Sequence, residues 1–568
     1  MNELKNRASQ WLQKPFDQHT QNQAKEMLLV DDANFQDSFY KDLEFGTGGM
    51  RGIMGVGTNR LNKYTIGKAT QGLANYLNKT FVNESIKIAI AFDVRHNSKA
   101  FASICANVLS ANGIEVLLFE DFRSTPLLSF AVREMKCKAG IVLTASHNPP
   151  EYNGYKVYWQ DGAQIVPPHD KNIISEVDEV NYEEIKFEGN SNKIQLIGEE
   201  IDQKFYAKSL EFAQFSKEEQ KDLSIVFTPI HGTSVFAIPS VLQKAGYNQV
   251  YLVKEQAEPS GDFFTVSSPN PEEPDALKMA WELAIEKDAD IFIGTDPDAD
   301  RLGVGVKEKK GEYHLLTGNQ TNILLTDFLL DKWKKAGKLD GKQFIGTTNV
   351  TTDMMYPLAK KYGVACFTGL TGFKWIAKMI SDHPELKFIC GGEESYGFLV
   401  DDFVRDKDAV TTALLFCEMA FELKQQNKTP LQKLKEIYVE LGFFKEDLLS
   451  ITKKGKEGTE EIKKLMQEFR LHPPKFLAES EVVAIEDYLT GEEINLKTSE
   501  RKTMNFPKSD VLIFRTQDGT KVAVRPSGTE PKIKYYIGVK GNLPTTEDYL
   551  EVEKKLNEKI VRIKAELV

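Results

Sequence analysis

The chain has 568 residues, of which 41% are hydrophobic and 27% charged, and its formal net charge is −11. This length exceeds what a single hydrophobic core organises, so we expect several domains. The negative charge disfavours a general nucleic-acid or anionic-membrane surface, and no apolar run approaches the roughly 20 residues of a membrane-spanning helix.

Three stretches of the chain repeat one alternation of apolar strands and helices. The first places strands at 86–92, 115–119 and 139–144 and helices at 98–112 and 126–135. The second places strands at 224–228, 249–253 and 290–294 and helices at 234–245 and 274–287. The third places strands at 344–348, 365–368 and 387–390 and helices at 352–362 and 372–380. Because such alternation forms parallel sheets covered on both faces, we predict three similar α/β domains with mainly parallel mixed sheets.

The last part of the chain follows a different pattern. Residues 443–509 are rich in Lys and Glu and show no parallel-sheet alternation. Strands are then expected at 510–516, 521–524 and 533–539, before an amphipathic helix at 546–563. Strands in quick succession with a terminal helix predict a small α+β domain. We therefore expect four domains, at residues 1–207, 208–320, 321–440 and 441–568.

A serine directly follows the last strand of the first repeat. The strand runs into Thr144-Ala145-Ser146-His147-Asn148-Pro149, and the Asn-Pro pair ends it. Open α/β sheets bind ligands at the carboxyl ends of their strands, which makes Ser146 a candidate functional residue. Taken alone, a serine in this position is more often a turn or capping residue. His147 is adjacent, but neighbours on an extended strand point in opposite directions, so adjacency is weak evidence for a Ser–His pair.

The last strand of the second repeat leads into three alternating aspartates. Asp296, Asp298 and Asp300 precede Arg301. Carboxylates this close repel one another and need a cation, and oxygen ligands suit Mg²⁺. An EF-hand is excluded, because its sixth position would be Arg301 instead of Gly and its twelfth Lys307 instead of Glu. The remaining alternative is an acidic surface turn.

Two more loops have ligand-binding chemistry. Cys390-Gly391-Gly392-Glu393-Glu394-Ser395-Tyr396-Gly397 ends the third repeat; its glycines allow close approach, and Glu393 and Ser395 can bind sugar hydroxyls. A helix cap explains this segment equally well. Arg525-Pro526-Ser527-Gly528-Thr529 lies between two strands and suits a phosphate, with Lys534 adding charge. A simple hairpin turn is the alternative there.

Together, these four loops resemble those of the α-D-phosphohexomutase superfamily, in the same order. That family places one loop from each of four domains around one cleft. The resemblance implies a phosphoserine at Ser146, and Mg²⁺ held by Asp296, Asp298, Asp300 and Ser146. The segments Gly46–Gly52, with Arg51, and Asn153–Lys156 also resemble active-site segments of the family.

The resemblance implies roles for further residues. The expected catalytic residues are Ser146, His147, Lys156 and Arg51. We favour Lys156 as the general base, with His147 and Lys374 as alternatives. The expected substrate-binding residues are Arg301, Thr371, Gly372, Lys374, Glu393, Ser395, Arg405, Lys407, Arg525, Ser527, Gly528, Thr529 and Lys534.

The sugar loop indicates the substrate class. Glu-Glu-Ser-Tyr-Gly at 393–397 resembles the phosphoglucomutase and phosphopentomutase branch of the family. The resemblance implies an isomerase that interconverts glucose 1-phosphate and glucose 6-phosphate through a phosphoserine and glucose 1,6-bisphosphate, which also acts as activator. Ribose or deoxyribose phosphates rank second, and a phosphomannomutase or a sugar bisphosphate synthase ranks below them. A non-catalytic phosphosugar-binding protein would be expected to lack Ser146 or an aspartate of the metal loop.

Cysteine usage predicts the compartment. The five cysteines include no Cys-x-x-Cys pair, and the amino-terminal residues are polar. We expect a reduced, cytoplasmic protein without disulfides, structural zinc or a signal peptide. Its expected partner is a phosphosugar, with no nucleic acid and no membrane, and we expect a monomer or a weak homodimer.

Overall fold

A computed structural model describes residues 2–46, 48–215, 221–308, 312–453, 455–527 and 532–567. The chain forms two compact units. The first comprises Met1–Leu316, Ile380–Asp382 and Tyr396–Glu422, and the second comprises Thr317–Met379, His383–Ser395 and Leu423–Val568. Among the described residues, no helix combines the length and the apolar character needed to cross a membrane.

The first α/β domain is built on a six-stranded sheet in the order β1-β5-β4-β2-β3-β6. Its strands are β1 (Gly49–Ile53), β2 (Lys87–Phe92), β3 (Glu115–Phe119), β4 (Ala139–Leu143), β5 (Tyr152–Trp159) and β6 (Ile194–Ile197). Strands β4, β2, β3 and β6 are parallel, whereas β5 and β1 run antiparallel. The three predicted strands are confirmed to within one residue at each end, and the parallel core with antiparallel additions is the expected mixed sheet.

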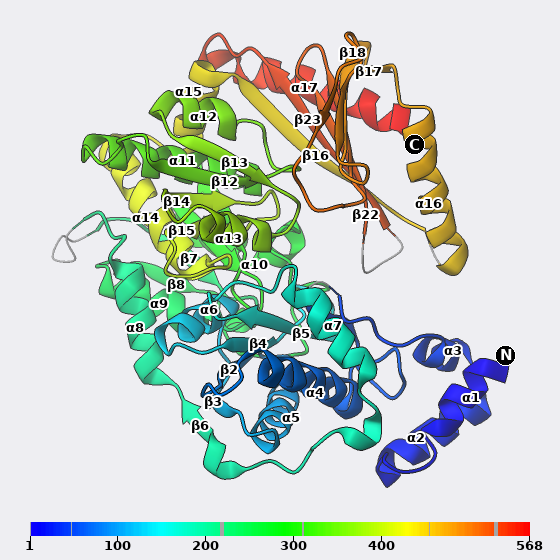
Figure 1. Cartoon of the computed structure of the whole chain (residues 1–568). Coiled ribbons are helices and arrows are strands. Elements are labelled where there is room, and N and C mark those ends of the chain that lie inside the picture. Colours follow the sequence, from blue (N-terminus) through cyan, green and yellow to red (C-terminus); the bar gives the residue numbers. More distant parts are fainter. Residues whose placement is uncertain are drawn as a thin grey trace. The chain divides into compact units, whose positions relative to one another are not determined.

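Helices cover both faces of this sheet. On one face, α4 (Lys63–Thr80), α5 (Ser98–Ala111) and α7 (His169–Glu179) share an apolar core with alternate strand residues, and Figure 1 shows α4 and α5 side by side over the strands. On the other face lies α6 (Thr125–Glu134). Gly140 of β4 faces α6 so closely that an added Cβ would lie 2.5 Å from a methyl group of Val132. Burial from both sides explains the continuous apolar character of β4.

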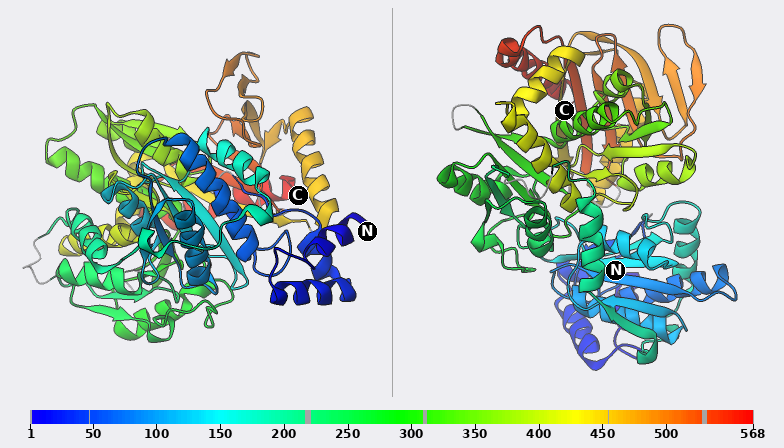
Figure 2. Two further views of the ribbon diagram at one scale, coloured as in Figure 1. Left: turned by 60° about the horizontal axis from the view of Figure 1, so that its bottom comes forward. Right: turned by 90° about the vertical axis from the view of Figure 1, so that its left-hand side faces the viewer.

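Three amino-terminal helices, which the sequence patterns did not predict, lie beside this domain (Figures 1 and 2). They are α1 (Asn2–Gln10), α2 (Gln18–Val30) and α3 (Ala33–Phe39). Trp11, Phe16, Phe35 and Phe39 form their core together with Tyr64 of α4. This aromatic cluster attaches the three helices to the α/β domain.

The second α/β domain has the strand order β11-β10-β9-β7-β8. Its elements are α8 (Glu199–Leu210), β7 (Ile225–Thr228), α9 (Ser234–Lys244), β8 (Val250–Leu252), α10 (Pro274–Lys287), β9 (Ile291–Thr295), β10 (Leu302–Lys307) and β11 (Tyr313–Leu316). Strands β9, β7 and β8 are parallel, and β10 returns antiparallel to β9. Residues 296–301 therefore form a hairpin connection at the carboxyl end of β9.

The second unit contains the third parallel sheet, β13-β12-β14. The elements along residues 318–441 are α11 (Gly318–Lys335), β12 (Gln343–Thr348), α12 (Met355–Tyr362), β13 (Ala365–Gly369), α13 (Phe373–Asp382), β14 (Lys387–Gly392), β15 (Phe398–Val400), α14 (Ala409–Gln425) and α15 (Pro430–Leu441). Of these, β15, most of α14 and the last residues of α13 belong to the first unit. The predicted strands at 344–348, 365–368 and 387–390 are confirmed, and each ends within two residues of its expected position.

The carboxyl-terminal domain is an antiparallel sheet in the order β16-β23-β22-β21-β18-β19-β20, with β17 paired to β18. Its strands are β16 (Phe443–Thr452), β17 (Phe476–Leu477), β18 (Ser480–Asp487), β19 (Glu492–Asn495), β20 (Arg501–Thr503), β21 (Leu512–Thr516), β22 (Lys521–Pro526) and β23 (Lys532–Gly541). Helices α16 (Gly455–Leu471) and α17 (Tyr549–Leu567) pack against β23. Figure 1 shows both helices beside the carboxyl-terminal sheet. The predicted α+β architecture is confirmed, but five of its strands come from the Lys/Glu-rich region to which the sequence patterns assigned none.

Candidate active site

Ser146 lies just beyond the carboxyl end of β4, as the sequence predicts. Its φ of +51° is in the left-handed region, which a serine adopts uncommonly. Its hydroxyl donates a hydrogen bond to Asp296 Oδ2 at 2.6 Å and lies 3.1 Å from His147 Nδ1. Because the backbone at Ser146 is left-handed, successive side chains here do not point in opposite directions as they do in an extended strand. The side chains of Ser146 and His147 can therefore contact each other.

The environment of His147 disfavours its charged form. Burial lowers the pKa of His147 well below its ordinary value, and the guanidinium groups of Arg301 and Arg51 lower it further. Arg51, on β1, donates from Nη1 to Asn148 Oδ1 at 3.0 Å. Arg51 therefore contacts the Ser146 loop, and the charge of Arg301 acts on His147 within it.

The three aspartates of the β9–β10 hairpin form one buried cluster. Asp296, Asp298 and Asp300 each contribute a carboxylate oxygen to a group in which all atoms lie within 4.8 Å of one another. Burial raises the pKa of Asp296, and the carboxylates of Asp298 and Asp300 raise it further. Burial by itself would raise the pKa of Asp298, but the Lys156 ammonium and the hydrogen bonds with Asp296, Lys156 and Thr125 together lower it.

Two lysines neutralise part of this charge. Lys156 Nζ lies 2.8 Å from Asp298 Oδ2 and 3.6 Å from Asp300 Oδ2, and Lys407 Nζ lies 3.1 Å from Asp300 Oδ2. Burial by itself would lower the pKa of Lys156, but Asp298 and Asp300 outweigh this effect, and the pKa is raised. The role of Lys156 as the general base stays a prediction. These contacts fit a lysine that stabilises negative charge.

The aspartate cluster fits a divalent metal ion. Asp298 Oδ1 and Asp300 Oδ1 are buried and accept no hydrogen bond from the described residues. Buried carboxylate oxygens without a partner are costly, so they indicate a missing ligand. With Asp296 and the Ser146 hydroxyl, they form an oxygen-only donor set, the type that Mg²⁺ prefers. The cluster could therefore bind a metal ion.

Two residues that the sequence analysis did not single out support this cluster. Thr125, at the start of α6, donates its N–H to the Asp298 carbonyl and its hydroxyl to Asp298 Oδ2, both at 2.9 Å. Glu272 forms an ion pair with Arg301. The Ser124-Thr125-Pro126 segment is typical of a helix start. That pattern does not predict the contact of Thr125 with a loop more than 170 residues away.

The 405–408 segment makes several buried contacts in the first unit. Lys407 reaches the aspartate cluster, whereas Arg405 donates from Nη1 to Ser381 Oγ at 2.9 Å and forms an ion pair with Asp402. Asp406 accepts a hydrogen bond of 2.6 Å from the Tyr158 hydroxyl. This segment thus brings one of its two predicted substrate-binding residues next to the cluster.

The buried carboxyl group of Asp408 should make the folding stability of the protein depend on pH. This carboxylate accepts hydrogen bonds from Val410 N and Thr411 N, and burial raises its pKa to about 6. Because the folded pKa lies above the unfolded value, the folded state binds more protons between about pH 4 and 6, and stability falls as pH rises through this window. The shift of about two pKa units corresponds to at most about 3 kcal/mol.

Asp408→Asn should remove this dependence, since an amide oxygen can accept the same N–H groups without titrating. We expect the difference between the melting temperature of the variant and that of the parent to increase from pH 4.5 to pH 7. Asp178→Asn, on the exposed side of α7, is the control and should follow the parent. Identical pH profiles for Asp408→Asn and the parent would contradict the prediction.

The second unit holds the predicted sugar-binding residues just beyond the carboxyl ends of β13 and β14, the two strands that flank β12. Glu393, after β14, is 5% exposed, and its Oε1 accepts a 2.9 Å hydrogen bond from Gly372 N. Thr371, after β13, donates to Asn349 Oδ1 at 3.2 Å. Ser395 is half-buried, and Lys374 Nζ lies 5.6 Å from the ring centre of Trp375. The structure therefore brings Thr371, Gly372 and Glu393 together.

The predicted phosphate loop connects β22 and β23 in the same unit. Arg525 and Lys534 occupy directly opposite positions on these antiparallel strands, and both are half-buried. Two cationic side chains in these positions would both attract a phosphate. Ser527 N donates to the Lys532 carbonyl at 2.7 Å, while Gly528 and Thr529 lie outside the described residues. The paired cations favour a phosphate-binding position.

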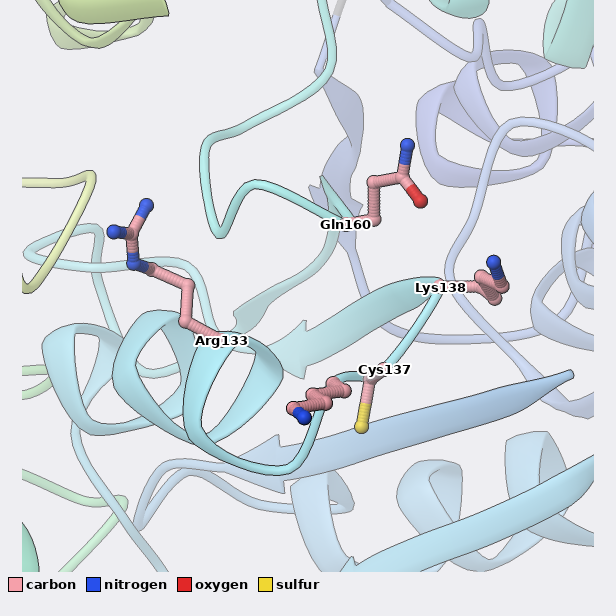
Figure 3. Close-up of a pocket in the computed structure, with 5 residues that line it drawn as sticks. Arg133, Cys137, Lys138 and Gln160 are labelled. Atoms are coloured by element: carbon pink, nitrogen blue, oxygen red, sulfur yellow. The ribbon is translucent and has the colours of Figure 1, made fainter.

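A separate pocket contains none of the predicted site residues. Arg133, Lys136, Cys137, Lys138 and Gln160 line it (Figure 3). It lies at the amino end of β4, whereas Ser146 follows the carboxyl end. Burial raises the pKa of the Cys137 thiol to about 12, so this pocket offers no reactive thiolate.

Comparisons with known proteins agree with this arrangement. The chain matches the family models described as phosphoglucomutase/phosphomannomutase, alpha/beta/alpha domains I, II and III, over residues 42–184, 204–311 and 317–441. It is 40% identical over 533 residues to a phosphoglucomutase of Staphylococcus aureus, covering 93% of this chain and 94% of that protein. A phosphoglucomutase of Staphylococcus epidermidis is 38% identical over 511 residues, covering 89% and 92%.

Solved structures share the fold. A putative phosphomannomutase from Thermus thermophilus superposes with a TM-score of 0.66 at 21% identity, covering 91% of this chain and 99% of that one. The open form of the Paramecium phosphoprotein pp63/parafusin, a phosphoglucomutase, superposes with a TM-score of 0.66 at 17% identity, covering 93% and 96%. From its three matched domains and its relatives, this chain belongs to the phosphoglucomutase/phosphomannomutase family, within the α-D-phosphohexomutase superfamily.

Proposed function

We propose that this phosphosugar mutase interconverts glucose 1-phosphate and glucose 6-phosphate by transferring a phosphoryl group to and from Ser146. The observation that carries the proposal is the 2.6 Å hydrogen bond between Ser146 and Asp296, which joins the serine loop to the aspartate cluster across 150 residues of sequence. The similarity to proteins named phosphoglucomutase supports the hexose reaction over the phosphopentomutase alternative.

The residues around Ser146 suit phosphoryl transfer. The transition state spreads negative charge over the phosphoryl oxygens, so that positioning and electrostatics carry most of the catalysis. Arg51, Lys156 and Arg301 are the cations that would stabilise this charge. Asp296, Asp298, Asp300 and an oxygen at Ser146 would hold Mg²⁺, which supplies Lewis-acid neutralisation of the phosphoryl group when bound.

The residues of the second unit would bind the rest of the sugar phosphate. Glu393 and Ser395 are acceptors and donors for sugar hydroxyls. Arg525, Ser527 and Lys534, with Gly528 and Thr529, would bind the phosphate that is not being transferred. Transfer from phosphorylated Ser146 gives glucose 1,6-bisphosphate. This intermediate must reverse its orientation in the site before its other phosphate returns to Ser146. The same bisphosphate would therefore serve as the activator that phosphorylates Ser146.

A substrate panel tests the proposed reaction. The 1-phosphates of glucose, mannose, N-acetylglucosamine and ribose are assayed with glucose 1,6-bisphosphate present, and we expect the highest kcat/KM for glucose 1-phosphate. A preference of ~10-fold or more is within reach of a few hydroxyl contacts. A higher kcat/KM for ribose 1-phosphate would contradict the proposal. Product analysis without the bisphosphate separates a mutase from a bisphosphate synthase.

The remaining expectations stay predictions from the sequence. These are the domain boundaries after residues 207, 320 and 440, the cytoplasmic location, and a monomeric or weakly dimeric state.

A further inference from the structure

The side chain of Arg95 contacts the loop that carries Ser146. Arg95 follows β2 by three residues, and its side chain has no solvent exposure. Its guanidinium donates to four main-chain carbonyl oxygens: from Nη2 to Ser146 at 2.6 Å and to Asn148, and from Nη1 to Pro149 at 2.8 Å and to Tyr152 at 3.1 Å. One side chain thereby fixes both ends of the segment that follows β4.

The Arg95 guanidinium is held in place by an ion pair and by an aromatic ring. Arg95 Nε lies 3.3 Å from Asp93 Oδ2, and Asp93 accepts a 2.7 Å hydrogen bond from the Ser98 hydroxyl. The ring of Phe263, from the second α/β domain, lies 4.9 Å from the guanidinium carbon. Since packing and a buried ion pair restrict Arg95 in this way, the four carbonyl groups meet a rigid donor.

The backbone at Ser146 requires such support. A serine in the left-handed region is strained and persists only where the surrounding structure determines its conformation. The Ser146 carbonyl is one of the four groups that Arg95 binds, so the contact acts on the strained residue directly. The side-chain hydroxyl points instead to Asp296, and Arg95 has no contact with it among the described residues.

We propose that Arg95 is a positioning residue for phosphoryl transfer. It holds the main chain of Ser146 in the left-handed conformation that directs the hydroxyl at Asp296. It acts through the backbone and not on the reacting atoms. This inference rests on the proposed role of Ser146 as phosphoryl carrier.

The test compares Arg95→Lys and Arg95→Ala with a matched control. Arg60 is also buried and donates to the main-chain carbonyls of Asp37 and Asn59, but it contacts no predicted site residue in the described part of the chain, so Arg60→Lys is the control. Each variant is assayed for kcat and KM with glucose 1-phosphate. The rate of Ser146 phosphorylation by glucose 1,6-bisphosphate is followed in parallel by intact mass.

Arg95→Lys should lower kcat and the rate of Ser146 phosphorylation ~100-fold, because a displacement of about 1 Å at a reacting group costs this much. Since the sugar contacts are untouched, KM should stay within ~3-fold of the parent, as expected for an interaction made only in the transition state. Added guanidinium ion should restore part of the activity of Arg95→Ala and none to Arg95→Lys, whose ammonium fills the space. Arg60→Lys should retain parental kcat.

Three results would overturn the proposal. The first is a folded Arg95→Lys protein with parental kcat. The second is a loss of activity proportional to the loss of folded protein, measured by circular dichroism and melting temperature, with no rescue of Arg95→Ala. The third is a parent protein that takes no phosphoryl group at Ser146, and this result alone overturns the proposed function as well.

Discussion

Replacing Ser146 by alanine is expected to abolish turnover and leave the fold intact. The substitution removes the oxygen that would carry the phosphoryl group, and no second hydroxyl contacts Asp296 among the described residues. Loss of a covalent nucleophile lowers kcat by roughly 10⁶-fold in enzymes where it has been measured. The hydroxyl makes contacts only to Asp296 and His147 in the described part of the chain, so the effect on unfolding should stay within about 1–3 kcal/mol.

Intact mass and kinetics together check this prediction. The parent should gain one phosphoryl group from glucose 1,6-bisphosphate, and Ser146→Ala should gain none. Ser103→Ala is the matched control, because Ser103 is exposed on α5 and, among the described residues, its hydroxyl bonds only to the Lys99 carbonyl. Turnover by Ser146→Ala at the parental rate, or its phosphorylation at another residue with turnover retained, would exclude Ser146 as the carrier.

The sequence predicted the parallel strands well because burial on both faces leaves a strong local signal. Strand β4 is apolar throughout, and its limits follow from Lys138 before it and the Asn-Pro turn after it. In contrast, β16 pairs with β23 over ten residues yet has a polar face, with only Phe443 fully buried. A strand of this kind gives no continuous apolar run, and its pairing partner lies about 90 residues further along the chain. The pattern of the local sequence therefore could not identify it.

The candidate site was predictable where its residues lie at strand ends and carry distinctive chemistry. Ser146 and the three aspartates follow β4 and β9, so the topology brings the carboxyl ends of parallel strands to one edge of each sheet. Their mutual contact, and the support that Thr125 gives to Asp298, depend on packing between domains. A single sequence does not record which distant residues meet. Positive φ at Ser146 was also invisible, because serine has no particular preference for that region.

Chelation of divalent metal is expected to stop turnover, and added Mg²⁺ to restore it. Three carboxylates are buried together, and the two lysine ammonium groups in contact with them leave Asp298 Oδ1 and Asp300 Oδ1 without hydrogen-bond donors in the described residues. A divalent cation would satisfy these oxygens. Asp298→Asn removes one anionic ligand atom. The amide oxygen of the variant can still accept the hydrogen bond from Thr125, and Lys156 can still form its ion pair with Asp300 at 3.6 Å. The variant should fold but need far more Mg²⁺.

Melting temperature with and without Mg²⁺ separates metal binding from catalysis. A ligand at 100 times its Kd stabilises the folded protein by about 2.7 kcal/mol, so saturating Mg²⁺ should raise the melting temperature of the parent. Asp298→Asn should require at least ~100-fold more Mg²⁺ for half of this shift and for half-maximal turnover, since even outer-shell substitutions cost ~10–100-fold in affinity. Asp275→Asn, on the exposed first turn of α10, should behave as the parent in both measurements. Turnover that persists in EDTA would remove the metal from the mechanism. Equal stabilisation of Asp298→Asn and the parent would place the ion elsewhere than at the aspartate cluster.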